Sequence, residues 1–281
     1  MSLLSAIQNV GRKAVYTVDA AVLTSSDITT RQLAAWAQDV IKIMAQRFEW
    51  PKLNKTATIT TDGTATYALP GDFSHYHFDS FWNESDGWRI LGPMSADEYA
   101  SFLGSGFEPL SDRFQIKGVT DKELFIYPTP GTGDILVLEY QAARPIRPVT
   151  WTTATAFAAG KYCFYNGNYY YSQFGGTSGA TPPTHTSNSA SDGGVSWAYY
   201  DGPYEDFHFD DDEPVLAQLV LEQGIFERFA EIKGLNFAPR FDGLIEEEYR
   251  KKVPSKTLYM AGVSSETSLT ALNGRATIGR P

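Results

Sequence analysis

The stretch Asp27–Trp50 reads DITTRQLAAWAQDVIKIMAQRFEW and predicts a long helix. Asp27 or Thr29 can accept hydrogen bonds from the first free amides, and Pro51 forces Trp50 out of helical geometry. The apolar residues recur at steps of three and four, so they share one helix face: Leu33, Trp36, Ala37, Val40, Ile41, Met44 and Phe48. Another part of the chain must therefore cover a wide apolar stripe.

The best cover is a second helical region at the other end of the chain, near residues 213–252. Pro214 suits the first turn of a helix, and apolar residues at helical spacing follow it up to Gly234. A further helix is predicted from about Pro239 to a stop before Pro254. With a short N-terminal helix that Gly11 is expected to end, these segments predict a helical bundle formed by both ends of the sequence.

The region after Pro51 predicts a small, mostly antiparallel sheet of about six strands. Thr56–Thr61 and Thr64–Leu69 flank Asp62-Gly63, a dipeptide typical of hairpin turns. Ser95 and Glu98 form a capping box in front of a short helix. Further strands are predicted over residues 75–82, 88–91, 113–117, 123–127 and 135–140.

Residues 149–203 differ from their surroundings in composition. They are rich in Gly, Ser, Thr, Tyr and Trp and nearly free of charge until the last few residues. Tyr162–Tyr165 and Tyr169–Tyr171 predict a hairpin, which a long loop over Gly175–Gly194 and a strand over Val195–Tyr199 follow. We expect an inserted all-β module.

The predicted fold class is therefore α+β. Residues 1–148 and 204–252 are expected to form one body, a helical bundle with the β-sheet. Residues 149–203 form the inserted module, and residues 253–281, which have no sustained periodicity, form an extended tail.

Composition excludes several classes of protein. The 281 residues, 42% hydrophobic and 14% aromatic, can bury a core. The net charge of −10 argues against a surface that holds DNA by its phosphates, but suits a surface that DNA must pass without sticking. One cysteine, Cys163, fits a reducing cytoplasm. With no signal peptide and no apolar run long enough for a membrane span, we expect a soluble protein with no membrane partner.

Several separated motifs occur in a fixed order. They are Leu3-Leu4, Thr30-Arg31-Gln32-Leu33, Phe48-Glu49-Trp50-Pro51, Tyr67-Ala68-Leu69-Pro70-Gly71-Asp72-Phe73, Trp82, Leu91-Gly92-Pro93-Met94-Ser95, Arg113-Phe114-Gln115-Ile116-Lys117-Gly118, Tyr127-Pro128-Thr129-Pro130, Leu138-Glu139-Tyr140, Asp212-Glu213-Pro214-Val215-Leu216 and Ala230-Glu231-Ile232-Lys233-Gly234-Leu235. Their order resembles that of the head-to-tail adaptor (connector, or neck) proteins of short-tailed bacteriophages, over residues 1–147 and 204–252.

This resemblance implies a structural, non-enzymatic virion protein without cofactors. It implies a homo-oligomeric ring, dodecameric in such phages, between the portal protein and the tail nozzle (tail tubular) protein, with a channel for the genome DNA. The protein would be assembled in the host cytoplasm and reside in the virion neck. The tail corresponds to the segment that docks on the portal, and its candidate contacts are Leu258, Tyr259, Met260, Leu269, Leu272, Arg275 and Ile278. We expect the free subunit to be monomeric and to form rings on a portal template.

A second hypothesis assigns the function to residues 151–201. Their motifs loosely resemble small aromatic β modules of phage surface proteins and, distantly, chitin-binding modules. Tyr169, Tyr171 and Tyr199 could stack on sugar rings or contact another virion protein, whereas Trp151 and Trp197 are expected in a miniature core. A cell-wall or glycan-degrading enzyme is a third, weaker hypothesis, because no spacing singles out a pair of the 33 acidic residues.

Other chemical signals have simpler interpretations. The acidic run Asp210–Glu213 lacks a calcium-loop pattern and is expected to complement a helix N-terminus. His75, His77 and Asp79 alternate along a strand but have no second ligand cluster, so no metal site is predicted. No catalytic signature surrounds Cys163.

Overall fold

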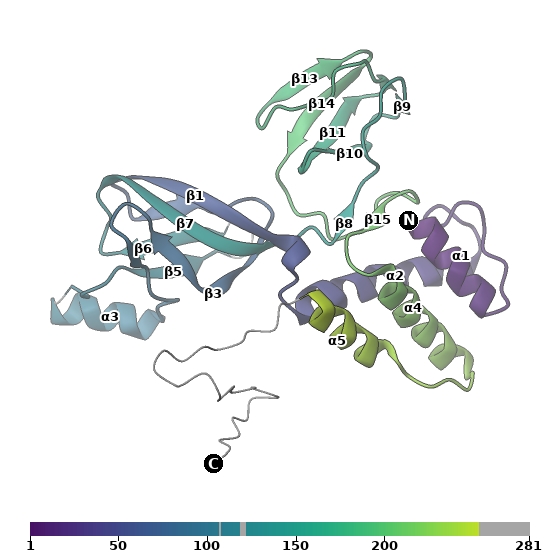
Figure 1. Ribbon diagram of the computed structural model, residues 1–281, viewed down its shortest axis with the longest axis horizontal. Coiled ribbons are helices and arrows are strands. Elements are labelled where there is room, and N and C mark those ends of the chain that lie inside the picture. Colours follow the sequence, from purple (N-terminus) through teal and green to yellow (C-terminus); the bar gives the residue numbers. More distant parts are fainter. Residues whose placement is uncertain (107, 119–121, 253–281) are drawn as a thin grey trace, which may run out of the picture.

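The computed structural model describes residues 1–106, 108–118 and 122–252 (Figure 1). In this part of the chain the fold is mixed α+β, with five α-helices and several antiparallel sheets. The predicted portal-docking tail, residues 253–281, lies outside the described residues. Among the described residues, no helix has both the length and the apolar character required to cross a membrane.

Four helices from the two ends of the chain share one hydrophobic core and lie together in Figure 1: α1 (Leu3–Lys13), α2 (Ile28–Arg47), α4 (Gln218–Lys233) and α5 (Phe241–Lys252). The apolar stripe of α2 is covered largely by α4, which also contacts α1 and α5. Ile41 and Met44 of α2 are fully buried in the same cluster as Leu221 and Ile225 of α4. The pattern of three- and four-residue steps thus identified the packed face of α2.

The ends of α2 follow their local sequence. The Asp27 carboxylate caps the helix, accepting a hydrogen bond from the Thr30 amide at 2.6 Å, and the Tyr16 hydroxyl donates to the same carboxylate. These hydrogen bonds lower the pKa of Asp27. The helix ends at Arg47, because Phe48 is extended and Trp50 turns into the core.

The prediction that Gly11 ends the first helix is wrong, since α1 continues to Lys13. Gly11 is buried inside the helix, and a Cβ there would lie 2.5 Å from a methyl of Val18 and 2.8 Å from the Tyr16 carbonyl oxygen. A glycine is therefore needed at position 11 because the chain that follows α1 packs too closely against it to leave room for a side chain.

The β region forms two antiparallel sheets rather than the single sheet predicted. The first has the order β1-β7-β3-β4, with β1 (Asn54–Asp62), β7 (Thr132–Ala142), β3 (Phe73–Asn83) and β4 (Trp88–Arg89). The second has the order β2-β6-β5, with β2 (Thr66–Ala68), β6 (Glu123–Tyr127) and β5 (Arg113–Lys117). A common core between them includes Phe81, Phe114, Leu124 and Leu138.

The hairpin predicted around Asp62-Gly63 is also wrong. The turn exists, with Gly63 at φ +84° and the Asp62 carboxylate accepting from the Thr64 amide, but β1 pairs with β7 and β2 pairs with β6. The predicted capping serine is confirmed at α3 (Ala96–Ser105), where the Ser95 hydroxyl oxygen accepts from the Glu98 amide at 3.1 Å.

Residues 149–203 contain a separate four-stranded antiparallel sheet of order β10-β11-β14-β13. Its strands are β10 (Tyr162–Tyr165), β11 (Asn168–Phe174), β14 (Val195–Tyr200) and β13 (Ser189–Asp192), and a two-stranded sheet joins β9 (Ala156–Phe157) to β12 (Gly176–Thr177). The predicted hairpin is confirmed by the pairing of β10 with β11. The segment predicted as a long loop contains β12 and β13.

The predicted helix start at Pro214 is wrong. Glu213–Pro214 forms β15, which pairs with β8 (Ile146–Arg147), and α4 begins only at Gln218. The acidic run before it does not complement a helix N-terminus. Asp210 accepts hydrogen bonds from the amides of Val22 and Leu23, and Asp211 pairs with Lys161 at 2.7 Å. The acidic run therefore bonds the segment before α4 to the chain that follows α1 and to Lys161.

Asp212 is fully buried and makes stability depend on pH. One carboxylate oxygen accepts from the Tyr204 hydroxyl and from the amides of His208 and Phe209, while the other has no hydrogen-bond partner. Burial raises the pKa of Asp212 from 3.8 to about 6. The folded chain therefore binds a proton that the unfolded chain has lost, and this contribution to stability falls as pH rises from about 4 to about 6.

Replacing Asp212 with asparagine is expected to remove that pH dependence. The Asn amide oxygen can accept the same hydrogen bonds without burying a charge. The native chain should lose up to about 3 kcal/mol of unfolding free energy between pH 4 and pH 7, and the variant should not. The stability difference in favour of the variant should therefore grow by that amount over this pH range. Urea unfolding across this pH range measures the change. The control is Asp206→Asn, because Asp206 forms a half-exposed pair with Lys42; equal pH slopes for the native chain and Asp212→Asn would contradict the expectation.

Candidate functional site

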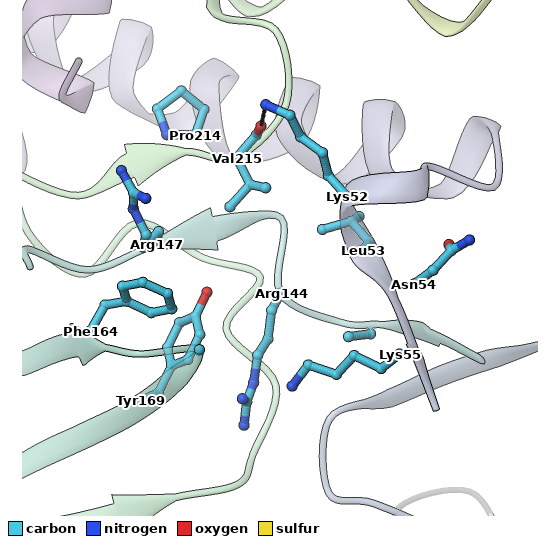
Figure 2. Close-up of a pocket in the computed structure, with 12 residues that line it drawn as sticks. Lys52, Leu53, Asn54, Lys55, Arg144, Arg147, Phe164, Tyr169, Pro214 and Val215 are labelled. Carbon is cyan, nitrogen blue, oxygen red and sulfur yellow. Dashed lines mark hydrogen bonds between the residues drawn. The ribbon is translucent and has the colours of Figure 1, made fainter. Parts of the chain in front are cut away.

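The helical core, the first β-sheet and the sheet of residues 149–203 meet at a cleft of about 470 Å³, which we call the junction cleft. Figure 2 shows cationic and apolar side chains around it. The lining residues are Lys52, Leu53, Asn54, Lys55, Ala142, Arg144, Arg147, Phe164, Gly167, Tyr169, Pro214 and Val215.

Strand pairing gathers four cations at the cleft. Lys52 lies in the short 3-10 helix η1 (Pro51–Leu53), and Lys55 is the second residue of β1. Arg144 and Arg147 follow the end of β7. Because β1 and β7 are antiparallel, with Asn54 opposite Gln141, the start of one strand lies beside the end of the other.

Arg144 links the β region to the sheet of residues 149–203. Its side chain is 3% exposed, and its Nε atom lies 3.2 Å from the Asp72 carboxylate, next to the start of β3. Nη2 donates to the Tyr200 carbonyl oxygen at 3.0 Å, and Nε donates to that of Gly202 at 3.2 Å. The guanidinium also lies 4.5 Å from the ring centre of Tyr169 in β11. One side chain thus binds the β region to the sheet of residues 149–203.

The partner of Arg144, Asp72, is itself nearly fully buried. It accepts hydrogen bonds from Lys55 Nζ at 2.7 Å and from the Tyr140 hydroxyl at 2.8 Å. Burial, followed by the Asp72 charge, raises the pKa of Tyr140. The buried carboxylate is therefore well compensated, and it holds the side chains of Lys55 and Arg144 beside the cleft.

The other two cations are less compensated. Arg147 Nη2 lies 2.5 Å from the Glu213 carboxylate, which also pairs with the N-terminal ammonium of Met1, and Arg147 Nε has no hydrogen-bond partner. Lys52 Nζ donates to the Val215 carbonyl oxygen at 3.1 Å, and no carboxylate pairs with it among the described residues. Burial lowers the pKa of Lys52, and the charges of Lys252 and Arg147 lower it further. An additional anion would therefore be attracted here.

The chemistry of the lining suits the binding of an anion. None of the twelve lining residues is an Asp or Glu, so the walls themselves carry no negative charge. They supply ammonium and guanidinium groups beside apolar surface from Phe164, Leu53 and Val215. Such walls suit an acidic side chain carried on a peptide segment.

The tyrosines considered for glycan or partner contact occupy different environments. Tyr169 is 4% exposed, donates its hydroxyl to the Ile146 carbonyl oxygen at 2.9 Å and packs with the helical core. Its ring is thus not available to stack on a sugar. Tyr171 and Tyr199 are half-buried, with their rings against Tyr162 and Tyr170 respectively. The three rings do not form one exposed platform.

The remaining aromatic and cysteine predictions concern the small core of residues 149–203. Trp197 is fully buried and Trp151 packs at the edge of that core, with its Nε1 donating to Asp192 at 2.9 Å. Cys163 is buried in the same cluster, and burial raises the pKa of its thiol. Packing in this core therefore explains why Trp151, Cys163 and Trp197 occur at these positions.

The possible metal ligands that alternate along the sequence of β3, His75, His77 and Asp79, do not form one site. His77 is buried and its Nδ1 lies 3.2 Å from Glu49, whereas Asp79 adopts φ +62° and pairs with Arg89 at 3.0 Å. A register shift between Tyr76 and Phe81 breaks the predicted alternation. Within the described ranges, no group of three or more His, Cys, Asp or Glu side chains could hold a metal ion.

The predicted portal-docking residues all lie in the part of the chain that the structure does not describe: Leu258, Tyr259, Met260, Leu269, Leu272, Arg275 and Ile278. The junction cleft was not predicted from the sequence. A usable signal existed, because Lys52 and Lys55 precede one predicted strand while Arg144 and Arg147 follow another, and antiparallel pairing of these strands places all four together.

Residues 1–171 match the model of the SU10 adaptor protein family, so the chain belongs to this family. It is accordingly a structural adaptor of a bacteriophage, a component of the virion neck that interacts with other virion proteins. The match ends within β11 and does not include residues 204–252, where the sequence resemblance was expected to resume. No curated protein sequence matches the chain.

Proposed function

We propose that this chain is the head-to-tail adaptor subunit of a short-tailed phage. Copies form a ring, dodecameric by analogy with such adaptors, between the portal and the tail nozzle, and the DNA passes through its centre. The observation that carries this proposal is the family match over residues 1–171. The net charge of −10 supports a channel that repels DNA within about one Debye length, ~10 Å.

We further propose that each part of the chain has its own role in the ring. The helices of both chain ends, with the two β-sheets, form the ring body as a helical bundle with attached sheets. Residues 149–203 are an inserted module fixed to this body through Arg144 and Tyr169. Residues 253–281 dock on the portal, using the apolar residues and Arg275 named above.

Deletion of residues 255–281 is expected to abolish assembly on the portal while leaving the subunit folded. The reason is that, among the described residues, the helical core already includes α5, which ends at Lys252. Purified subunit and the portal protein of the same virus are mixed, and the complex is measured by electron microscopy, which also reports the symmetry of the ring.

The control is the full-length chain carrying Leu219→Ser, a change at an exposed position of α4. If the truncated chain assembles as efficiently as the full chain, the docking role of the tail is refuted. If the full chain does not bind portal at all, the adaptor position itself is refuted.

A further inference from the structure

The ladder of β1 and β7 carries opposite charges at its two ends. Figure 1 shows both strands running side by side from the junction with the helices to the far end of the β region. The near end holds the cations of the junction cleft. Nine residues of β1 at ~3.4 Å each separate the two ends by about 30 Å.

The far end, which we call the acidic tip, consists of strand ends and loops from both sheets. Its carboxylates are those of Asp62, Glu84, Asp86, Asp112 and Asp134. The loops are adjacent, because the Glu84 amide donates to the Ile135 carbonyl oxygen and Asp62 pairs in register with Thr132. Burial, with the nearby charges of Asp86 and Asp134, raises the pKa of Asp112. None of the five forms an ion pair within the described residues.

From this arrangement we propose that the junction cleft of one subunit receives the acidic tip of a second copy of the chain. The cleft holds Lys52, which pairs with no carboxylate among the described residues, and Arg147, which pairs with Glu213 but keeps an Nε without a hydrogen-bond partner. The tip, at the other end of the same ladder, has carboxylates that form no ion pair among the described residues. Contacts between two different patches of identical chains are heterologous and propagate head to tail, which closes a ring when the rotation permits. The inference rests on the proposed ring, since it names the contact between neighbouring subunits.

A peptide loop fits the cleft better than a nucleic acid does. The cleft of about 470 Å³ has apolar walls from Phe164 and Val215 beside its cations. A loop can place one or two acidic side chains between such walls, whereas duplex DNA is too wide to enter and is repelled by the net charge of −10. Binding of duplex DNA in place of a second copy would therefore contradict the proposal.

Concentration-dependent sedimentation of the full chain tests the contact. We expect a weak association, with a Kd of about 0.1–1 mM, so the chain is monomeric at micromolar concentration. Raising NaCl from about 50 mM to about 500 mM shortens the Debye length from roughly 14 Å to roughly 4 Å and should weaken the association at least tenfold. A native chain that stays monomeric at millimolar concentration, or associates independently of salt, would overturn the proposal.

Charge reversal on each side provides the specific test. Lys52→Glu with Arg147→Glu reverses the cleft, and Glu84→Lys with Asp134→Lys reverses the tip. Each double variant alone should lose the association. An equimolar mixture of the two should recover it, because the reversed tip of one then fits the reversed cleft of the other. Recovery also shows that both variants are folded.

The matched control is Arg228→Glu with Lys233→Glu, which changes the net charge as the cleft variant does but lies on α4, away from the cleft. It should associate like the native chain, apart from the general effect of added negative charge. A mixture that stays monomeric although both variants unfold cooperatively would refute the contact. Rings of normal symmetry built on portal from the cleft variant would refute this contact but leave the adaptor function intact.

Discussion

Replacing Arg144 with methionine is expected to lower the free energy of unfolding by about 3 kcal/mol. The substitution leaves the buried Asp72 carboxylate with only Lys55 and Tyr140 as partners, and it leaves the carbonyl oxygens of Tyr200 and Gly202 without their donor. The Tyr169 ring loses the guanidinium above it. The loss should be measured by urea unfolding, together with protease sensitivity of residues 149–203, which should increase.

The control for Arg144 is Arg89→Met. Arg89 pairs with Asp79 at the surface, where both side chains are more than one third exposed. Its loss should change stability by less than about 0.5 kcal/mol. Adding Asp72→Asn to Arg144→Met should restore part of the loss, because it removes the buried carboxylate that Lys55 alone would otherwise have to balance. Equal effects of the Arg144 and Arg89 substitutions would show that the buried cluster does not hold the β region and the sheet of residues 149–203 together.

The sequence predicts most secondary structure here because the signals are local. The helical spacing of residues 28–47, the Asp27 cap and the hairpin at Asn166-Gly167 all depend on neighbours within a few residues, and the structure has each of them. Asn166 and Gly167 have φ values of 47° and 86°, which the Asn-Gly pair tolerates well.

Strand partners, in contrast, could not be predicted from the turn between them. Asp62-Gly63 marks a reversal of the chain but does not specify that β1 will pair with β7, about 80 residues away, while β2 pairs with β6. Likewise, Pro214 suits a helix start by local rules, yet its neighbour Val215 donates its amide to the Pro145 carbonyl oxygen beside β8. Distant backbone pairing outweighs the local preference in both cases.

The side-chain environment of the candidate site follows from the same long-range contacts. Alternation along β11 distinguishes its two faces but cannot show that the face with Tyr169 packs on the helical core. The junction cleft needs four separate segments, which come together only once the strand order is known. Individual elements of the site could therefore be predicted, but not their meeting point.

Replacing Trp50 with alanine is expected to have the largest effect on the helical core, about 4 kcal/mol. Trp50 is fully buried where the end of α2 meets α5 and the first sheet. Its indole Nε1 donates to the Met44 carbonyl oxygen at 2.6 Å, and its ring packs edge-on against Phe48 and Tyr249. The cavity left by the indole cannot be filled by these rings without moving α5. Urea unfolding and hydrogen exchange in α5 measure the two consequences.

Two further variants separate burial from hydrogen bonding at this position. Trp50→Phe keeps an aromatic ring but removes the indole donor, so it should cost less than half as much as alanine, about 1–2 kcal/mol. Trp88→Ala removes the same side chain from the edge strand β4, where it is 62% exposed, and should change stability by less than about 1 kcal/mol. Because Gln141 accepts from the Trp50 amide and donates to the Ala45 carbonyl oxygen, the alanine variant keeps this link between α2 and β7. Faster hydrogen exchange in α5 with unchanged exchange in β7 would therefore show that the alanine variant loses the contact between Trp50 and α5. Equally faster exchange in both elements would mean that the indole, and not Gln141, holds the helices to the sheet.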